Sequence, residues 1–417
     1  MQCPHFDAGR CRSCTLLGTP HAAQVADKQA HVSRLLGAAG AAAGAANSSP
    51  GGGQAQGIDW LPPVTGPESG FRNKAKMVVS GTAEEPVLGI LDQAGRGVDL
   101  TDCGLYPPAL QTAFAPLEQF IRRAGLRPYE VFGRTEPQRA GQRTSRRATA
   151  GRGELKYLLV TISPDGELMV RFVMRSTEAL ARIRKHLPEL RSDLPNLAVA
   201  TVNVQPAHAA VLEGDREIVL TESRTLTMRV DGVPLGLRPQ SFFQTNTQVA
   251  ADLYRQAREW VDDVDPASLW DLYCGVGGFA LHCAAPGRSV TGIELSREAV
   301  AAASATADSL GLRDVRFEAG DARGVAERLA SGAPEMVIVN PPRRGIGADL
   351  ARALDSSAVG HVLYSSCNAT TLASDLSHMP GLRPVRGVLL DMFPQTQHYE
   401  VLLMLRRDRS PQRGLGA

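Results

Sequence analysis

The C-terminal part of the chain alternates short apolar runs with helix-length segments. From about residue 241 the runs read SLWDLY, SVTGIEL, VRFEAGD and EMVIVNPP, each followed by a segment long enough for a helix, and then HVLYSSC. This alternation predicts βαβ units and a parallel sheet buried on both faces. Two further runs, PVRGVLLDMF and HYEVLLMLRR, are separated only by PQTQ. Because so short a connection cannot cross over a sheet, this pair is predicted to be antiparallel.

Five parallel strands that end in an antiparallel pair are the order expected of a class I methyltransferase, an α/β fold with a Rossmann-like seven-stranded sheet. We assign this catalytic domain to residues 231–407 and expect a disordered tail at 408–417. Residues 58–230 mix strand patterns such as AKMVVSG, YLLVTIS and LMVRFVM with a helical ALARIRKHLPEL. This central block is predicted to be an α+β domain.

The N-terminal 57 residues divide into two segments of different composition. Residues 1–36 hold three cysteines and a short helical segment, ADKQAHVSRLL. Residues 37–57 consist almost entirely of Ala, Gly and Ser, and a helix of that composition has no face to bury. We therefore predict a flexible linker over 37–57.

Composition narrows the class of protein. A hydrophobic content of 43% and a net charge of +2 are those of an ordinary soluble protein without a bulk attraction for nucleic acid. Any RNA contact must then come from local basic loops, for which FRNKAK (71–76) and the stretch 134–152 are candidates. No apolar run reaches the ~18 residues of a membrane span, and the polar N-terminus is no signal peptide. We expect a cytoplasmic protein with no membrane partner.

A glycine turn after the first strand of the sheet indicates a nucleotide-type site. In DLYCGVGGFAL the glycines 275, 277 and 278 allow the backbone to pass close beneath a ligand. Glu294 ends the next strand about 20 residues later, where its carboxylate can accept the two ribose hydroxyls of a nucleoside. These two features fit S-adenosylmethionine, but GVGGFA also satisfies the NAD-binding pattern.

Residues at the ends of the third and fourth strands favour the methyl donor. VNPPRRG is a stiff turn that can aim Asn340 and its neighbouring carbonyls at a planar base or a methyl-donor centre. Asp321, in EAGDAR, lies where it can meet an adenine amine, although it can equally cap the helix that follows.

A thiol ends the fifth strand on the same rim. Cys367 beside a methyl donor suggests addition of a thiolate to carbon 6 of a pyrimidine, which makes carbon 5 nucleophilic towards the sulfonium methyl. A base must then remove the proton from carbon 5 so that the thiol can leave. Glu400, at the start of the last strand, is the candidate base, and His398 is the alternative.

A second group of cysteines lies far from this rim in the sequence. Cys3, Cys11 and Cys14 fall within twelve residues, and Cys103 is available later. In a reducing compartment such a set indicates a metal site rather than disulfides. Zinc and a [4Fe-4S] cluster both accept four cysteines, and the spacing does not distinguish them.

Six motifs together resemble one family over residues 3 to about 405, interrupted by the Ala/Gly segment. They are CPHFDAGRCRSC, SFFQTN, DLYCGVGGF, VNPPRRGIG, YSSCNATT and DMFPQTQHYE. This set resembles the bacterial 23S ribosomal RNA uracil-5-methyltransferases of the RlmC (RumB) type. The extra barrel of the RlmD type and the missing cysteines of the tRNA enzymes distinguish those relatives, and RNA cytosine methyltransferases carry a thiol where this chain has NPPRRG.

The resemblance implies S-adenosylmethionine-dependent methylation of a specific uridine at carbon 5 in 23S rRNA, with an iron-sulfur-bearing N-terminal α+β domain. It implies a [4Fe-4S] cluster on Cys3, Cys11, Cys14 and Cys103, Cys367 as nucleophile, Glu400 as base, and cofactor contacts from Gln244, Tyr273, Glu294 and Asn340. Position 273 is often Phe in such proteins, so Tyr273 is a mild departure.

We expect a monomer whose partner is 23S rRNA, with the target uridine flipped out or in a hairpin loop. A different uridine of 23S rRNA or of tRNA is the alternative target. Two rivals of other classes are an NAD-dependent oxidoreductase, suggested by GVGGFA, and a non-catalytic RNA-binding metalloprotein, suggested by the cysteines and basic loops.

Overall fold

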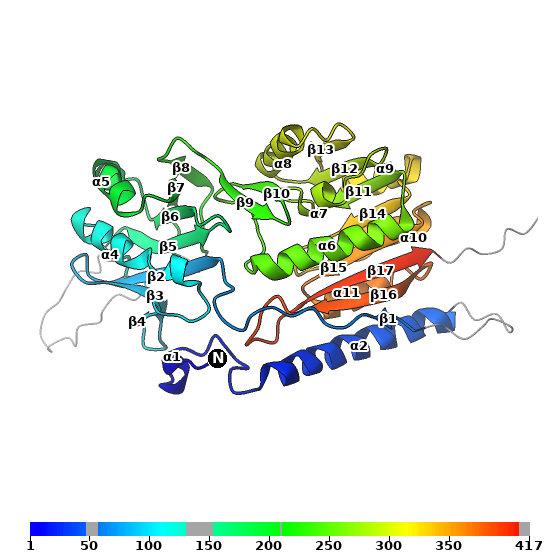
Figure 1. Ribbon diagram of the computed structural model, residues 1–417, viewed down its shortest axis with the longest axis horizontal. Coiled ribbons are helices and arrows are strands. Elements are labelled where there is room, and N and C mark those ends of the chain that lie inside the picture. Colours follow the sequence, from blue (N-terminus) through cyan, green and yellow to red (C-terminus); the bar gives the residue numbers. More distant parts are fainter. Residues whose placement is uncertain (47–56, 131–152, 209–210, 408–417) are drawn as a thin grey trace, which may run out of the picture. The chain divides into compact units, whose positions relative to one another are not determined.

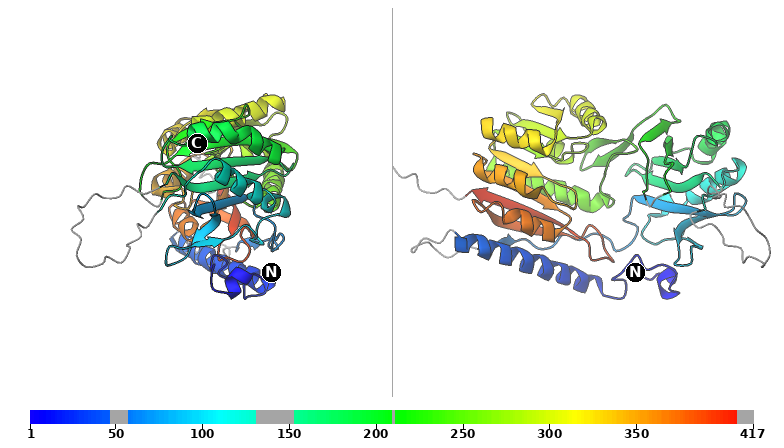
Figure 2. Two further views of the ribbon diagram at one scale, coloured as in Figure 1. Left: turned by 90° about the vertical axis from the view of Figure 1, so that its left-hand side faces the viewer. Right: turned by 180° about the vertical axis from the view of Figure 1, so that it is seen from behind.

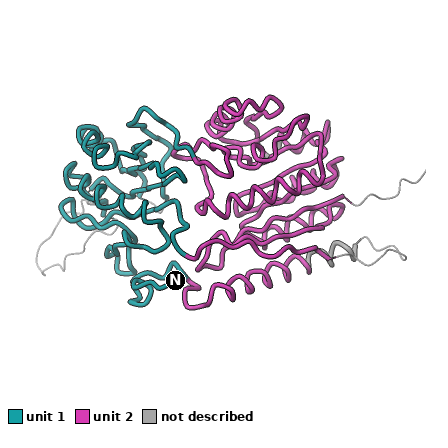
Figure 3. The backbone as a smooth tube through the Cα atoms, in the orientation of Figure 1, with its two compact units in different colours: residues 1–14, 69–227 teal, residues 15–68, 228–417 magenta. Residues whose placement is uncertain are grey.

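The computed structural model describes residues 1–46, 57–130, 153–208 and 211–407. The chain forms two compact units, each built from two separate parts of the sequence (Figure 3). The first unit comprises Met1–Cys14 and Ser69–Thr227, and the second comprises Thr15–Glu68 and Met228–Ala417. The segment 1–36, which we treated as one piece, is therefore divided after Cys14.

The second unit contains an eight-stranded sheet in the order β1-β16-β17-β15-β14-β11-β12-β13 (Figure 1). The strands are β1 (Asp59–Trp60), β11 (Ser268–Leu272), β12 (Ser289–Glu294), β13 (Val315–Ala319), β14 (Met336–Val339), β15 (His361–Ser366), β16 (Leu382–Leu390) and β17 (Glu400–Arg407). Neighbouring strands from β13 to β15 are parallel, and β17 runs antiparallel to both β15 and β16. The predicted class I methyltransferase sheet is confirmed, with β1 as an added edge strand parallel to β16.

Helices cover both faces of this sheet (Figures 1 and 2). They are α2 (His21–Ala46), α6 (Thr247–Val264), α7 (Gly278–His282), α8 (Arg297–Ser309), α9 (Ala322–Ser331), α10 (Gly347–Ser356) and α11 (Ala369–Leu376). Buried residues of α2, α9, α10 and α11 share one apolar core with the strands. No helix in the described part of the chain is long and apolar enough to cross a membrane.

Helix α2 extends further than the sequence pattern suggested. It continues through Ala46, so the linker predicted to begin at residue 37 is helical over residues 37–46. Val25, Val32 and Leu36 are buried in the core of the second unit and anchor the first part of the helix. An anchored helix needs no new nucleus to propagate, and alanine has the highest helix propensity. The rest of the predicted linker, 47–56, and the tail 408–417 lie outside the described residues.

The first unit is an α+β domain, but its bounds differ from the predicted block 58–230. It contains Ser69–Thr227 together with Met1–Cys14, while residues 58–68 and 228–230 belong to the second unit. The seven-stranded sheet of the first unit has the order β4-β3-β2-β5-β6-β7-β8. The elements are α1 (Pro4–Asp7), β2 (Lys74–Gly81), β3 (Pro86–Leu91), β4 (Gly97–Asp99), α3 (Pro108–Gln111), α4 (Phe114–Arg123), β5 (Leu155–Ile162), β6 (Leu168–Met174), α5 (Leu180–Asp193), β7 (Leu197–Val204) and β8 (Arg216–Val219). A two-stranded sheet of β9 (Leu226–Val230) and β10 (Val233–Leu237) follows.

The two basic segments proposed for RNA have different outcomes. Strand β2 begins at Lys74, so the second half of FRNKAK is strand rather than loop. Of its two lysines Lys76 is exposed, whereas burial lowers the pKa of Lys74 to about 8. The stretch 134–152 lies outside the described residues.

Candidate active site

The predicted site residues of the second unit gather at one edge of its sheet. Tyr273, Glu294, Asp321, Asn340 and Cys367 stand at or just beyond the carboxyl ends of β11, β12, β13, β14 and β15. These five strands are neighbours, and the chain order reverses between β14 and β11. Open α/β sheets bind ligands at such a reversal, beyond the carboxyl ends of the strands.

The glycine turn after β11 is required mainly by close packing of the protein. A Cβ on Gly277 would lie 2.8 Å from the Phe317 ring, and one on Gly278 would lie 2.4 Å from the Tyr254 hydroxyl. A Cβ on Gly275 would meet no atom within 4 Å, although its φ of +55° still favours glycine. Packing against Phe317 and Tyr254 by itself requires glycine at 277 and 278, and the ligand-binding role of the turn stays a prediction.

Glu294 joins the glycine turn to the loop after β12. Its Oε2 accepts a hydrogen bond from the Gly275 amide at 3.1 Å, and its Oε1 accepts one from the Ser296 amide at 2.9 Å. The carboxylate is thus held beside the turn, and its ribose-binding role stays a prediction. Beyond it lies a pocket of about 430 Å³ lined by Ile293, Leu295, Arg297, Ala319, Gly320, Asp321, Gly324, Val325 and Arg328.

Asp321 caps α9 and also lines that pocket. Its Oδ1 accepts a hydrogen bond from the Gly324 amide at 2.9 Å, which confirms the helix-cap interpretation. Its presence in the pocket wall keeps the adenine contact as a prediction.

Gln244 and Asn340 are the remaining predicted cofactor contacts to be located. Gln244 is buried, and it lies in the segment before α6. Asn340 directly follows β14, and its backbone amide donates a hydrogen bond to the Leu272 carbonyl at 3.4 Å. The end of β14 is thereby tied to the end of β11.

Asp271 is a buried acid within the quoted glycine motif that we did not single out. Its Oδ2 accepts from the Ala280 amide at 2.9 Å, while its Oδ1 has no hydrogen-bond partner among the described residues. Burial raises the pKa of this carboxyl to about 7. Asp271 thus holds the first turn of α7 through the Ala280 amide. Its position just before the glycines is the sequence feature that could have identified it.

Cys367 and Glu400 are brought together by strand pairing. In the antiparallel register Ser366 is opposite Val401, so the next position places Cys367 opposite Glu400. The Ser365 hydroxyl donates a hydrogen bond to Glu400 Oε1 at 2.6 Å. Glu400 is only 1% exposed, and burial raises its pKa to about 7 although the bond from Ser365 acts in the opposite direction.

The environment of the thiol contains opposing charges. Burial raises the pKa of Cys367, and the Glu400 carboxylate raises it further. Arg343 lowers it, both by its charge and by a side-chain hydrogen bond to the thiol. Arg343 lies within the quoted VNPPRRG motif, but sequence reasoning gave it no role.

The loop that carries Arg343 is tied to α11. The Arg343 carbonyl accepts hydrogen bonds from Asn368 Nδ2 at 3.0 Å and from Thr371 Oγ1 at 3.1 Å. Asn368 also caps α11 through the Thr370 amide. Asn368, the residue after Cys367, therefore holds the loop from which Arg343 reaches the thiol.

Asp375 on α11 holds the far end of the same loop. Its carboxylate accepts from the Ile346 amide at 2.9 Å, from the Gly347 amide at 3.1 Å and from the Tyr364 hydroxyl at 2.6 Å. A Cβ on Gly345, where φ is +79°, would lie 2.3 Å from Asp375 Oδ2. Glycine at 345 therefore permits both the turn and the carboxylate contact.

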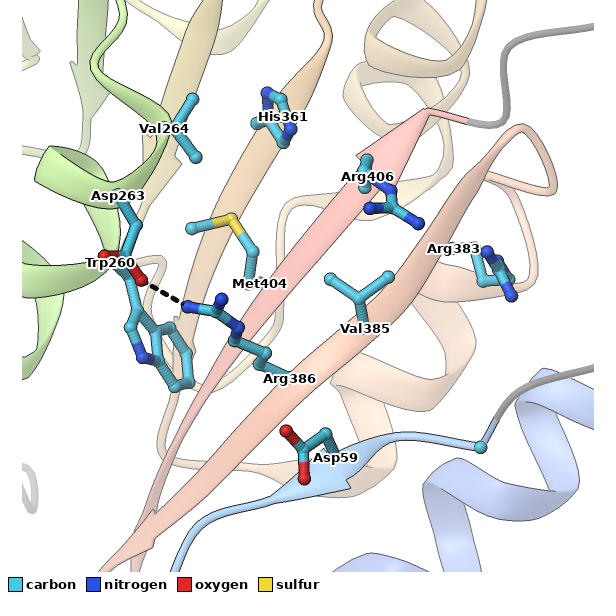
Figure 4. A pocket seen from close by; sticks show the side chains of 11 residues that line it. Asp59, Trp260, Asp263, Val264, His361, Arg383, Val385, Arg386, Met404 and Arg406 are labelled. Carbon is cyan, nitrogen blue, oxygen red and sulfur yellow. Dashed lines mark hydrogen bonds and ion pairs between the residues drawn. The ribbon is translucent and has the colours of Figure 1, made fainter.

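A larger pocket lies at the opposite edge of this sheet (Figure 4). It measures about 720 Å³ and includes His361, which opens β15, and Arg406, near the end of β17. Arg386 reaches across it to Asp263, with 2.5 Å between Nη1 and Oδ2. None of our candidate residues lines this pocket, and it lies at the amino ends of the parallel strands, where such sheets rarely bind ligands.

Comparison with known proteins identifies the family of the chain. The model of the tRNA (uracil-5-)-methyltransferase family matches residues 213–408. The 23S rRNA (uracil(747)-C(5))-methyltransferases RlmC of Yersinia pestis strain Pestoides F and Yersinia pseudotuberculosis serotype I are each 50% identical over 406 residues, which is 97% of this chain and 99% of theirs. The chain belongs to the RNA uracil-C5-methyltransferase family. Membership in this family excludes both rivals: the NAD-dependent oxidoreductase suggested by the glycine turn, and the non-catalytic RNA-binding metalloprotein suggested by the cysteines and basic loops.

A solved structure supports the same assignment at the level of the fold. The Pyrococcus abyssi tRNA (uracil-54, C5)-methyltransferase, in complex with S-adenosyl-L-homocysteine, is 25% identical with a TM-score of 0.72. The match covers 94% of this chain and 85% of that one. This methyltransferase fold therefore extends over nearly the whole chain.

The four cysteines predicted to form a metal site, Cys3, Cys11, Cys14 and Cys103, all lie in the first unit. His5 Nε2 and Asp102 Oδ1 are 2.6 Å apart and join the loop of Cys3, Cys11 and Cys14 to the turn of Cys103. Burial raises the pKa of Cys14 to about 11, and the other three thiols raise it as well. Among the described residues no three His, Cys, Asp or Glu side chains are grouped closely enough for a single metal ion.

We expect Gly345→Ala to destabilise the second unit. A left-handed residue with a Cβ costs about 1–2 kcal/mol, and displacement of the Asp375 carboxylate adds to that cost. Urea denaturation measures the change. Gly311→Ala is the matched control, because its φ is +67° and its Cβ would meet nothing within 4 Å. Equal destabilisation by the two variants would show that the contact with Asp375 has no energetic importance.

Proposed function

We propose that this chain methylates carbon 5 of uridine 747 in 23S rRNA with S-adenosylmethionine as the methyl donor. The names of the relatives that are 50% identical support the reaction and the target base. The bound S-adenosyl-L-homocysteine of the archaeal relative supports the donor. The observation that carries the mechanism is the pairing of β15 with β17, which sets a thiol opposite a buried carboxyl at the carboxyl edge of the sheet.

The first step is addition of the Cys367 thiolate to carbon 6 of the uracil. The new carbon–sulfur bond moves the electron pair of the 5,6 double bond onto carbon 5 and the adjacent carbonyl oxygen as an enolate. Arg343 favours the thiolate through its charge and its hydrogen bond, against the effects of burial and of Glu400. A Glu400 that is neutral at this stage disfavours the thiolate less than an ionised one.

The second and third steps require Glu400. Carbon 5 of the enolate would take the sulfonium methyl as the sulfur–methyl bond breaks and S-adenosylhomocysteine leaves, so that one proton then has to be removed from carbon 5. Glu400 accepts this proton, the double bond re-forms and the thiolate leaves. A carboxyl with a pKa near 7 is matched to this role, because it is ionised often enough to act yet basic enough to accept the proton.

We assign the donor site to the rim and to the pocket beyond Glu294. Glu294 would accept the ribose hydroxyls, Asp321 would face the adenine, and Gln244, Tyr273 and Asn340 would flank the methyl-bearing end. The close approach of β11 and β12 at the glycine turn and the 430 Å³ pocket support this order.

The four cysteines are proposed to hold a [4Fe-4S] cluster. Their position in one unit and the mutual effect of the thiols on the Cys14 pKa fit a shared site. A tetrahedral zinc ion with bonds of ~2.3 Å requires sulfur atoms less than about 4 Å apart, whereas a cluster holds its thiolates farther apart. We propose a structural role for the cluster, because the methyl transfer itself needs no electron. The cluster would join the N-terminal segment to the turn at Cys103.

RNA bearing 5-fluorouridine tests the nucleophile. The wild-type protein should form a covalent adduct, since fluorine at carbon 5 cannot be removed as a proton, and Cys367→Ala should form none. Denaturing gels of protein with labelled RNA measure both. Cys283→Ala, at a buried thiol within the same unit, is the control and should still form the adduct. An adduct with Cys367→Ala would contradict the mechanism, and tRNA as a second substrate tests the alternative target.

The base is tested by the pH dependence of turnover. Burial raises the pKa of Glu400 to about 7, so elimination should accelerate as the pH rises through that value. Ser365→Ala removes a bond that lowers this pKa, so the rise should move to higher pH. Ser309→Ala, whose hydroxyl donates to the Thr306 carbonyl, is the control. An unshifted profile in Ser365→Ala would separate Glu400 from the base role.

Glu400→Gln should methylate ordinary RNA but release it slowly, since loss of a general base costs about 10²–10⁴-fold. The covalent complex should therefore accumulate on denaturing gels. A normal turnover rate in this variant would contradict the assignment.

The cluster is tested by the visible absorption and iron content of anaerobically purified protein. We expect a coloured protein with four irons per chain for a [4Fe-4S] cluster. Cys14→Ser should lose the colour and part of its thermal stability, whereas Cys283→Ser should keep the colour. A colourless protein that contains zinc would contradict the proposal.

A further inference from the structure

We infer that helix α2 is a positioning element for the general base: Gln24 and Lys28 hold the segment 391–399 and thereby fix where β17 places Glu400. This inference rests on the proposed role of Glu400. Both the helix and the segment belong to the second unit. In Figure 1 the connection between β16 and β17 passes beside the N-terminal part of α2.

The segment 391–399 is a connection without regular structure that leads directly into Glu400. It begins where β16 ends at Leu390 and finishes where β17 begins. Gln395, at its middle, has a φ of +67°, a strained value for a residue with a side chain. Such a conformation persists only where surrounding contacts determine it.

Gln24 supplies two of those contacts at the middle of the segment. Its Oε1 accepts a hydrogen bond from the backbone amide of Gln395 at 2.9 Å, and its Nε2 donates one to Gln395 Oε1 at 3.0 Å. The same Nε2 lies 2.8 Å from the Thr19 carbonyl and 3.0 Å from the Leu16 carbonyl. Gln24 is 1% exposed, so these bonds form away from water, where leaving them unmade is costly. The Leu16 backbone amide also donates to the Gln395 carbonyl at 2.9 Å, and Gln395 Nε2 donates to Glu68 Oε2 at 3.0 Å.

Lys28 and His21 hold the start of the segment. Lys28 Nζ donates to Asp391 Oδ1 at 2.5 Å and to the Phe393 carbonyl at 3.2 Å. His21 Nε2 lies 2.6 Å from the second oxygen of Asp391, which is completely buried. A buried carboxylate with two such partners is confined to one position, because any displacement leaves a charge unpaired.

The contact continues to the residue before the base. The ring of His31 meets the ring of Tyr399 edge to face, with 6.2 Å between centroids. Side chains spaced along α2 therefore touch the segment at its start, its middle and its end. The helix therefore contacts the connection along its whole length and not at a single residue.

The role of α2 predicts a selective defect in the elimination step. In Gln24→Ala the thiol and Arg343 are untouched, so adduct formation with 5-fluorouridine RNA should keep its wild-type rate. With ordinary RNA, turnover should fall by about tenfold. A misplacement of a catalytic group by about 1 Å can cost ~10²-fold, and the bonds from Lys28 and His21 should keep the displacement of Glu400 smaller than that. The covalent complex should accumulate as the proton of carbon 5 is removed more slowly.

Gln29→Ala is the matched control. Gln29 lies on the same helix and donates to Ser33 one turn along, so its loss should leave both reactions at wild-type rates. A thermal melt shows whether Gln24→Ala is folded. If it is not, Gln395→Ala removes the side-chain bonds to Gln24 and Glu68 while it keeps the backbone bond to Gln24, and it should show a smaller defect of the same kind.

The outcomes separate the two proposals. If Glu400→Gln accumulates the complex and Gln24→Ala does not, the inference about α2 is wrong while the base assignment stands. A Gln24→Ala variant that slows 5-fluorouridine adduct formation as much as turnover would also overturn it, because the helix would then support the whole site. If Glu400→Gln accumulates no complex, the base assignment fails, and the inference fails with it.

Discussion

The antiparallel pairing of β15 with β17 is the constraint on which the chemistry depends. Parallel strands alone would leave Cys367 at the end of a strand with no acid beside it. By running back along β15, β17 starts at the same edge where β15 ends, so its first residue faces the thiol. The Ser365 hydroxyl then fixes the carboxyl of Glu400 inside the protein. Burial at that position gives the carboxyl a pKa close to neutrality.

Carboxylates hold the connections around this edge. Glu294 accepts hydrogen bonds from two backbone amides beside the glycine turn, and Asp375 accepts hydrogen bonds from two more in the loop after β14. Asp391 binds Lys28 and His21 from α2. Connections at strand ends leave backbone donors without partners, and a charged acceptor satisfies them more strongly than a neutral one. Glu294 and Asp375 therefore hold their loops through backbone amides, whereas Asp391 holds its connection through side chains of α2.

The thiol is supported in the same way by residues from several elements. Arg343 comes from the loop after β14, Asn368 caps α11, and Asp375 lies on α11. The loop and helix are joined at both ends, so the cation beside Cys367 stays within reach of it. The chemistry of the nucleophile thus depends on the helix that follows it as much as on the strand that carries it.

The sequence by itself determined the parallel strands, the closing antiparallel pair and the residues at their ends. Those features depend on local periodicity and on the length of connections, which a linear pattern records. Cys367, Glu400 and Glu294 could be named because each ends or begins a recognisable strand. Only the tertiary structure decided that Gly277 and Gly278 make room for Phe317 and Tyr254, that α2 continues past residue 37, and that α2 holds the connection before Glu400. These depend on side chains up to 371 positions apart, such as Gln24 and Gln395, and no local pattern encodes a contact between residues so distant in the chain.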